Sequence, residues 1–594
     1  MSARLQSLRT AIAREGLDGF IVPRADEQLG EYVPACAERL AWLTGFTGSA
    51  GIAIVLPDRA AVFTDGRYTL QLTQETDAAN WERVHVVDTP PPMWLVPHAI
   101  GRRIGYDPWL MSEAGVAKYT EAKLTLVPVV NLVDAIWTDR PSRPADRAIA
   151  HPLKWAGQDS AEKRKAIGEA LTKARQDAAV VTDTAAIAWL FNLRGADLPF
   201  TPVALGFAVV EASGKATLFM DGNKLVGLDG WLGPDVIHRE RAELATALAA
   251  FSGRVVRVDT GGNPAWFAQT LRAAGATVVD GPDPCALPRA CKNPIEQAGA
   301  RAAHHRDAVA LCRFLHWLDT DGVGQIESAI AARVRDFRAA LPECRGESFP
   351  AIAGAGSNGA VIHYRAIPGQ DRALGANETL LVDSGGQYGD GTTDVTRTVW
   401  TGPDDPPAAL RDRFTRVLQG HIALAMTVFP VGVSGPHLDA FARRALWNAG
   451  LDYDHGTGHG VGSYLSVHEG PAGISRAGRM VPLAEGMVLS NEPGLYVPGA
   501  YGIRLENLML VQPAQEKWLR FETLTLAPFD MRLVDPAMLT MPETAWLDDY
   551  HARVVAEVGP QLDGPAHAWL IRVCGAAGST AANHGESSGS SAKG

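Results

Sequence analysis

The stretch ETLLVDSGGQYGDGTTDVTRTVW, residues 378–400, is the starting point for interpreting the whole chain. An apolar run ending at Asp383 meets a glycine-rich turn and then a second run rich in threonine and valine, which predicts a β-hairpin. A turn centred on Tyr388 and Gly389 would place Asp383 directly opposite Asp394. Directly opposed like charges, with Cβ atoms about 5 Å apart, are destabilising. A divalent cation between the two carboxylates would remove that repulsion.

The alternative is that both aspartates are solvated turn residues, because aspartate is common in turns. That explanation suits Asp390, which lies in the turn itself. It suits Asp383 poorly, since Asp383 directly follows the apolar run 380–382. The metal hypothesis is therefore favoured for Asp383 and Asp394, and it requires further ligands elsewhere in the chain.

Three later residues are candidates for those ligands. His459 lies in the glycine-rich string HGTGHGVG, which is a weak signal alone because a loop histidine is more often structural. Glu492 follows the strand-like MVLS in the turn NEPG. Glu506 lies inside YGIRLENLMLV, which predicts an apolar strand where an unpaired carboxylate is costly. Arg504 shares its face by the two-residue period and could neutralise Glu506 without any metal.

As a set, the five residues are more specific than any one of them. Four carboxylates and one imidazole make a hard, oxygen-rich site that suits Mn²⁺ and related divalent ions. One ion rarely needs four carboxylates, whereas two ions about 3.5–4 Å apart share them and hold a hydroxide between them. The sequence therefore predicts metal-assisted hydrolysis at Asp383, Asp394, His459, Glu492 and Glu506.

The bulk properties limit the class of protein. A chain of 594 residues with 46% hydrophobic and 20% charged residues should form several domains with large cores. The net charge of −11 argues against nucleic acid or an anionic membrane as the main partner. Six scattered cysteines indicate a reducing compartment. With no signal-like N-terminus and no membrane-spanning run, we expect a cytoplasmic location.

The N-terminal half contains an internal duplication. AWLTGF and TDGR in the first copy correspond to AWLFNL and MDGN in the second, about 150 residues later. Trp42 matches Trp189, and Asp65 matches Asp221; the tryptophans are expected in the cores. We expect an α/β (α+β) chain with domains at 1–150 and 151–290, a catalytic domain at 291–540, a C-terminal extension at 541–573 and a disordered tail at 574–594.

Four strings of the C-terminal half resemble the pita-bread metallopeptidases, a family that includes methionine aminopeptidases, prolidases and Xaa-Pro aminopeptidases. The similarity is closest to the long, three-domain Xaa-Pro aminopeptidases (aminopeptidase P), and it extends over nearly the whole chain without a departure at the five ligand positions. The strings are NGAVIHYR (358–365), VDSGGQYGDGTTDVTRT (382–398), HGTGHGVGSYLSVHEGP (455–471) and NEPGLYVPGAYGIRLEN (491–507).

This resemblance implies a pita-bread catalytic domain behind two creatinase-like domains, two Mn²⁺ ions and a homodimer. It also implies roles for further residues. His363 resembles the histidine that contacts substrate near the proline, and His468 resembles the one that supports the scissile carbonyl and its oxyanion. His455 matches a histidine that lines the substrate pocket, although a structural role in its loop is the alternative. Glu492 matches the ligand that also acts as proton shuttle.

The predicted activity is hydrolysis of the peptide bond between an N-terminal residue and a penultimate proline. One alternative is a prolidase that accepts only Xaa-Pro dipeptides. Another is a non-catalytic peptide-binding relative, which would have no reason to retain the whole set of ligands and histidines. A creatinase-like hydrolase uses the same fold without metals and would not need all five ligands.

Overall fold

The computed structural model describes residues 2–575, and the predicted disordered tail lies outside the described residues from 576 onward. The chain forms two compact units, one ending at Arg289 and the other beginning at Ala290. Each unit has its own sheets and its own hydrophobic core. None of the helices within residues 2–575 combines the length and the apolar character needed to cross a lipid bilayer.

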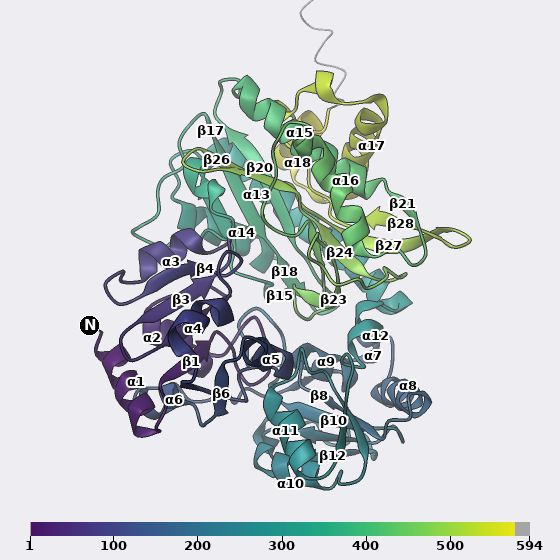
Figure 1. The fold of residues 1–594 in the computed structure, drawn as a ribbon. Coiled ribbons are helices and arrows are strands. Elements are labelled where there is room, and N and C mark those ends of the chain that lie inside the picture. Colours follow the sequence, from purple (N-terminus) through teal and green to yellow (C-terminus); the bar gives the residue numbers. More distant parts are fainter. Residues whose placement is uncertain (1, 576–594) are drawn as a thin grey trace, which may run out of the picture. The chain divides into compact units, whose positions relative to one another are not determined.

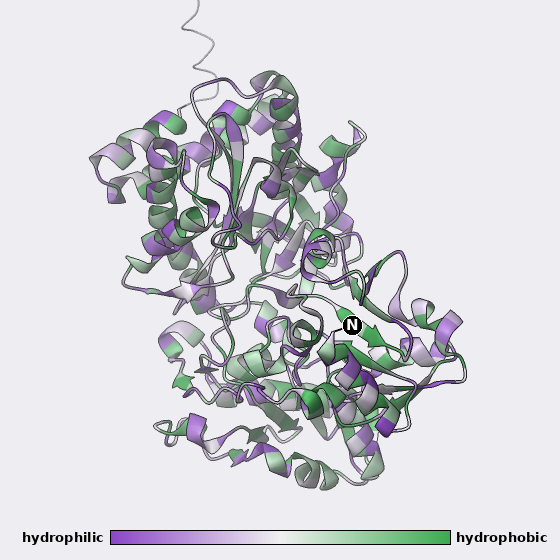
Figure 2. Cartoon of the chain, turned by 90° about the vertical axis from the view of Figure 1, so that its left-hand side faces the viewer, coloured by the Kyte–Doolittle hydropathy of each residue, from purple (hydrophilic) through white to green (hydrophobic). Residues whose placement is uncertain are grey.

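The first unit begins with a sheet of six strands (Figure 1), namely β1 (Gly19–Pro23), β2 (Ile52–Val55), β3 (Ala60–Thr64), β4 (Glu82–His85), β5 (Arg103–Tyr106) and β6 (Thr125–Pro128). Their spatial order is β4-β3-β2-β1-β5-β6, with β1 antiparallel to β2 and parallel to β5. The central strands are mostly hydrophobic (Figure 2), as expected for a sheet covered on both faces.

Helices cover both faces of this first sheet. Successive side chains of a strand point to opposite sides, so each strand contributes apolar residues to both cores. Phe20 and Val22 share a core with α1 (Ala3–Arg14), α2 (Arg39–Thr44) and α6 (Leu132–Ile136). Ile21, between them, packs instead with α4 (Pro91–Ala99) and α5 (Glu113–Glu121). The result is a three-layer α/β domain.

A second sheet repeats this plan with β8 (Ala178–Val181), β10 (Phe207–Glu211), β11 (Ala216–Phe219), β12 (Val236–Arg239), β13 (Val255–Val258) and β14 (Thr277–Asp280). Its order, β12-β11-β10-β8-β13-β14, matches the first strand for strand, and so do the antiparallel and parallel pairings. The duplication predicted from the sequence is therefore confirmed. The flanking helices include α8 (Ser160–Lys173), α9 (Thr184–Leu190), α10 (Leu244–Ala249) and α11 (Ala265–Ala273).

A buried carboxyl follows β1 in the first domain. Asp26 is 1% exposed, and its Oδ1 accepts hydrogen bonds from the amides of Gln28 and Gly30 at 3.0 and 3.1 Å. Its Oδ2 is buried without a hydrogen-bond partner among the described residues. Burial, with a further contribution from neighbouring Glu27, raises the pKa of Asp26 from 3.8 to about 6.

This pKa predicts a pH-dependent effect of Asp26→Asn. Above pH 6 the folded chain must bury the charge, whereas between pH 6 and 4 it takes up a proton that the unfolded chain does not yet bind. Wild-type stability therefore gains from this group as the pH falls. We expect Asp26→Asn to stabilise the protein at pH 7.5 by up to about 3 kcal/mol, with the gain reduced to about 1 kcal/mol at pH 4.5. Melting curves at both pH values measure this, and an equal gain at both would contradict it.

The strands of the second unit form several separate sheets. β16 (Ile352–Ala355), β17 (Glu378–Ser384) and β20 (Val395–Thr401) form one sheet, and β25 (Gly494–Val497) pairs with β26 (Tyr501–Arg504). A six-stranded sheet in the order β21-β28-β27-β24-β22-β23 completes the unit (Figure 1). Its strands are β21 (Val428–Pro430), β22 (Gly458–Gly460), β23 (Glu469–Ile474), β24 (Val488–Asn491), β27 (Asn507–Gln515) and β28 (Trp518–Thr523).

Four helices pack with these strands: α13 (Pro294–Asp321), α14 (Glu327–Ala339), α15 (Ala408–Ala425) and α16 (Gly435–Trp447). Residues that commonly begin helices do so in two of them. Asn293 accepts from the amides of Ile295 and Glu296 ahead of Pro294, and Ser434 caps α16. Gly450, just beyond the end of α16, has a φ of 70°, a left-handed conformation that glycine commonly adopts after a helix.

The hairpin of residues 378–400 forms, but its register differs from the prediction. Asp383 pairs with Thr396 rather than with Asp394, and Tyr388 pairs with Gly391. The turn is therefore at positions 389–390, one residue later than expected. Moving the turn by one residue moves the pairing by two, which keeps every side chain on its face. Asp383 and Asp394 are thus diagonal neighbours on one face instead of directly opposed.

The predicted continuous strand at 501–511 is interrupted. β26 ends at Arg504 and β27 begins at Asn507, so Glu506 lies in the gap. The amide of Glu506 leaves the ladder and donates to the carbonyl of Thr396 at 3.1 Å. A break of this kind re-aims a side chain, and it places the Glu506 carboxylate beside β20.

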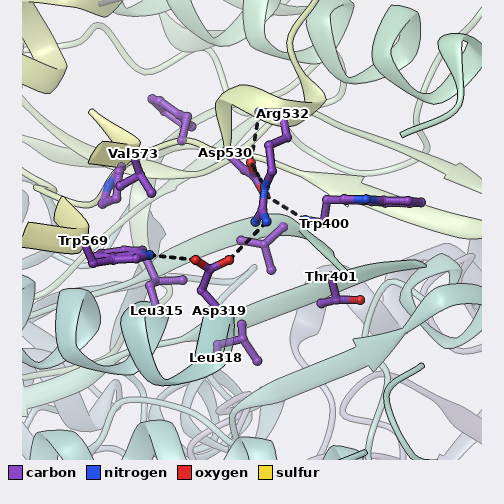
Figure 3. A pocket seen from close by; sticks show the side chains of 12 residues that line it. Leu315, Leu318, Asp319, Trp400, Thr401, Asp530, Arg532, Trp569 and Val573 are labelled. Atoms are coloured by element: carbon purple, nitrogen blue, oxygen red, sulfur yellow. Dashed lines mark hydrogen bonds and ion pairs between the residues drawn. The ribbon is translucent and has the colours of Figure 1, made fainter. Parts of the chain in front are cut away.

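The C-terminal extension consists of α17 (Met541–Val558) and α18 (Gly564–Val573). Figure 3 shows how α18 is anchored: Asp319 of α13 accepts from Trp569 Nε1 and from Arg532, both at 3.1 Å. Arg532 also makes a two-bond contact with Asp530 at 2.9 and 2.8 Å. These groups line a small pocket beside β20, with Trp400 on its wall.

Candidate metal centre

The structure brings the five predicted ligands to one region of the second unit. Asp383 lies at the end of β17 and Asp394 just before β20, so the two come from one hairpin. The other three come from the six-stranded sheet and its connections: His459 on β22, Glu492 after β24 and Glu506 between β26 and β27. Each of the five therefore lies on a strand or at a strand end.

Three of the five converge closely. One ligand atom from each of Asp394, His459 and Glu506 lies within 4.8 Å of the others, and within residues 2–575 this is the one group of three or more such side chains that does so. Glu492 joins them, because its Oε1 lies 3.4 Å from Nε2 of His459. Asp383 contributes an Oδ1 that is buried without a hydrogen-bond partner among the described residues.

The electrostatics of the group favour a bound cation. Burial, followed by the charges of Asp383 and Glu492, raises the pKa of Asp394 well above its ordinary value. Burial also raises the pKa of Glu506, and the charge of Asp394 adds to that effect. Several carboxylates buried so close together are costly unless they are paired or coordinate metal. The donor set, four carboxylates and one imidazole, fits divalent ions that prefer oxygen ligands.

His459 is oriented for coordination. Its Nδ1 lies 3.0 Å from the carbonyl of Gly460, so Nδ1 carries the proton and Nε2 is left with its lone pair. That Nε2 lies 3.5 Å from Oδ2 of Asp394. The backbone bond thus fixes both the tautomer and the ring orientation that a metal ligand requires.

Two hydroxyl groups that the sequence analysis did not select orient the carboxylates. Thr396 Oγ1 donates to Glu506 Oε2 at 2.9 Å. Ser490 Oγ donates to Glu492 Oε1 at 3.1 Å and accepts from the amide of His459 at 2.9 Å. Ser490 stands two residues before Glu492, so the two-residue period of its strand could have revealed it.

Arg504 forms an ion pair with Asp383, so the alternative of an Arg504–Glu506 pair is wrong. Its Nη2 donates to Asp383 Oδ2 at 2.6 Å, and its Nη1 donates to the hydroxyl of Tyr496 at 2.8 Å. Asp383 therefore has one oxygen fixed by a guanidinium and the other directed to the cluster. Arg504 positions the carboxylate and still leaves an oxygen for metal.

Two of the three predicted substrate histidines lie at the cluster. The ring of His468 stands nearly perpendicular to that of His459, with centroids 4.4 Å apart. Nε2 of His455 lies 2.9 Å from the hydroxyl of Tyr496, which links it to Arg504. His363 lies half-buried in the loop after the short helix η4 (Gly356–Ala360), which packs against β26. The role of His363 stays a prediction.

Family models match almost the whole described chain. Creatinase/prolidase N-terminal domains match residues 4–136 and 139–296, metallopeptidase family M24 matches 298–513, and the C-terminal region of that peptidase family matches 517–577. The domain limits proposed from the sequence stay a prediction.

Full-length relatives extend these matches. The chain is 38% identical to a protein of Laccaria bicolor described as "Probable Xaa-Pro aminopeptidase P", over 96% of this chain and 93% of that protein. It is 37% identical to "Aminopeptidase P2" of Arabidopsis thaliana, over 96% of this chain and 87% of that protein. The chain belongs to the aminopeptidase P family of M24 metallopeptidases. The predicted family and the predicted mixed α/β architecture are both confirmed.

A solved structure of the aminopeptidase P family has the same fold. The crystal structure of X-prolyl aminopeptidase from Caenorhabditis elegans superimposes with a TM-score of 0.90 at 33% identity, covering 96% of this chain and 98% of that one. That protein is described as a cytosolic enzyme with a di-nuclear active site. The similarity therefore includes the two N-terminal domains as well as the unit that carries the ligand cluster.

Proposed function

We propose that the chain is a metal-dependent aminopeptidase that hydrolyses the bond between an N-terminal residue and a penultimate proline. The observation that carries this proposal is the convergence of Asp394, His459 and Glu506 with Glu492 and Asp383, in a chain related over its full length to Xaa-Pro aminopeptidases. The same full-length similarity favours this activity over that of a dipeptide-specific prolidase or a non-catalytic binder.

Two divalent ions would be held by Asp383, Asp394, His459, Glu492 and Glu506, and the hard donor set supports Mn²⁺. When bound, such ions supply Lewis acidity that polarises the scissile carbonyl and activates water at neutral pH. The di-nuclear centre of the nematode relative supports two ions rather than one. Asp394 and Glu506 are the most buried of the five, with 4% and 2% exposure, so their carboxylates would be the costliest to leave without a cation.

The side chains around the ligands supply the remaining chemistry. Ser490 holds Oε1 of Glu492, which leaves Oε2 to take a proton and to deliver it to the departing proline nitrogen. That nitrogen is a tertiary amide and has no N–H before cleavage. His468 would donate a hydrogen bond to the scissile carbonyl oxygen as negative charge develops on it. His455 and His363 would line the substrate pocket.

A tripeptide comparison tests the proposed activity. Protein loaded with Mn²⁺ is expected to release free arginine from Arg-Pro-Pro and none from Arg-Ala-Ala, because only the first offers the proline that the site is proposed to recognise. Removing the metal should abolish release, and adding Mn²⁺ should restore it. Cleavage of Arg-Pro without cleavage of Arg-Pro-Pro would indicate a prolidase. Absence of both metal and activity would indicate a binding protein.

We also propose a cellular context for this chain. The nematode relative is described as a cytosolic enzyme, and we propose the cytoplasm for this chain as well. A homodimer is proposed from the family resemblance, and light scattering of the purified protein tests it. Peptides with proline at the second position are the proposed partners, without a role for nucleic acid or membrane.

A further inference from the structure

A buried guanidinium lies directly behind the metal ligand Glu506. Arg397, on β20, is 3% exposed and has Phe529 packed 4.3 Å from its guanidinium carbon. Within residues 2–575 its hydrogen-bond partners are oxygens of carbonyl, amide and phenol groups rather than a carboxylate. These partners are Thr396 O at 2.9 Å, Glu506 O at 2.6 Å, Asn507 Oδ1 at 2.8 Å, Ala527 O at 2.7 Å, Pro528 O at 3.1 Å and the hydroxyl of Tyr550 at 3.0 Å.

The segment around Glu506 is held at three successive residues, two by their backbone carbonyls and the third by its side chain. His421 Nδ1 lies 3.2 Å from the carbonyl of Leu505, and Arg397 donates to the carbonyl of Glu506. Asn507 completes the set, because its Oδ1 accepts from Arg397 and its Nδ2 lies 3.1 Å from Nε2 of His421. Burial lowers the pKa of His421 to about 3, so its ring is neutral and can donate through Nδ1 while accepting through Nε2.

The guanidinium of Arg397 is held in turn from the C-terminal extension. Tyr550 lies on α17, and its hydroxyl accepts from Arg397 Nη2 and from the amide of Ala527 at 3.2 Å. The same oxygen lies 3.0 Å from the carbonyl of Thr525, to which it can donate. Tyr550 is 5% exposed, so water does not replace these bonds easily.

We propose that Tyr550 and Arg397 are positioning residues for the metal ligand Glu506, so that helix α17 is a functional part of the metal centre. The inference rests on the proposed metal-dependent function. Loss of the tyrosine hydroxyl would let the guanidinium shift, and the carbonyl of Glu506 would lose its fixed donor. Groups behind a ligand usually matter about 10- to 100-fold for metal affinity or activity.

Tyr550→Phe is the direct test, because it removes one oxygen and leaves the packing of the ring in place. Calorimetric titration of the metal-free protein with Mn²⁺ is expected to show about 10-fold weaker binding of at least one ion. On Arg-Pro-Pro we expect kcat to fall about 10-fold with KM nearly unchanged, since no substrate contact is removed. Arg397→Lys, which keeps the charge but loses the planar fork, should weaken Mn²⁺ binding further.

Two matched variants separate positioning from general loosening. Tyr119→Phe removes an equally buried hydroxyl in the first unit. Arg532→Ala removes the ion pairs of Arg532 with Asp319 and Asp530, beside the residues that hold α18 (Figure 3), without touching Arg397. Both should keep wild-type Mn²⁺ affinity, even where Arg532→Ala lowers the melting temperature.

The outcomes are distinguishable. Wild-type Mn²⁺ affinity in Tyr550→Phe would overturn the inference while leaving the proposed function intact. Equal losses of affinity in Tyr550→Phe and Arg532→Ala would also overturn it, because the extension would then act only through overall stability. A wild-type chain that binds no Mn²⁺ would instead overturn the proposed function and the inference with it.

Discussion

Asp383→Ala and Glu492→Ala are each expected to abolish turnover of Arg-Pro-Pro, with losses of roughly 10³-fold or more. Metal ions in hydrolases contribute several kcal/mol to the transition state, and each 1.4 kcal/mol is about tenfold in rate. Asp383 has one oxygen fixed by Arg504 and a second that is buried and available to a metal. Removing it takes away that ligand atom and leaves the Arg504 charge without its carboxylate.

Metal content and activity should change together in these variants. Elemental analysis is expected to show less than the wild-type complement of metal in Asp383→Ala, and excess Mn²⁺ should restore little of the rate. Asp390→Ala is a matched control, because Asp390 lies in the turn of the same hairpin and pairs with Arg306 instead of facing the cluster. It should keep wild-type activity. Full activity in Asp383→Ala or Glu492→Ala would show that the site has been placed wrongly.

The hairpin illustrates which features of the site could be predicted from sequence. The predicted turn placed Asp383 and Asp394 on one face, and a turn one residue later keeps them there, because alternation along a strand has a period of two. The register was wrong because the string QYGDG allows turns centred one residue apart. In the fold, β18 (Gly386–Tyr388) pairs with β15 (Cys344–Glu347) in a separate sheet, a contact with a distant segment that the hairpin's own sequence does not show.

Contacts between distant segments could not be predicted from local pattern. Arg504 and Glu506 share a face in sequence, which made their pairing plausible. In the fold the strand is interrupted between them, and Arg504 reaches Asp383, 121 residues away. The contact of Arg397 with Tyr550 spans 153 residues and likewise carries no local signal. By contrast, Thr396 and Ser490 lie two residues from ligands, and attention to the same strand face would have found them.

The duplicated domains were predictable for a different reason. A repeat can be recognised by comparing the sequence with itself, and no contact between distant residues needs to be known. Both copies also carry the same order of helices and strands. Trp42 and Trp189 show the limit of such a comparison. Trp189 is 5% exposed, whereas Trp42 is only partly buried and stacks on Trp137 at a centroid distance of 5.4 Å. Equivalent positions keep the fold while their surroundings diverge.

His468→Ala should lower kcat by about 10²–10³-fold while leaving metal affinity close to that of the wild type. A donor aimed at a developing oxyanion contributes about that much, and it acts mainly in the transition state. The His468 ring packs against His459 without supplying a predicted ligand atom, so the ions should still be held. Retained metal affinity would therefore distinguish His468→Ala from Asp383→Ala, in which metal and activity are expected to be lost together.

Calorimetric Mn²⁺ titration and steady-state kinetics on Arg-Pro-Pro measure the two quantities in the same preparation. His305→Ala, a partly buried histidine on α13, is a suitable control and should change neither. KM for Arg-Pro-Pro should rise less than kcat falls if His468 acts on the oxyanion. A mainly raised KM would instead assign His468 to substrate binding, and a parallel loss of Mn²⁺ affinity would make it a support of His459.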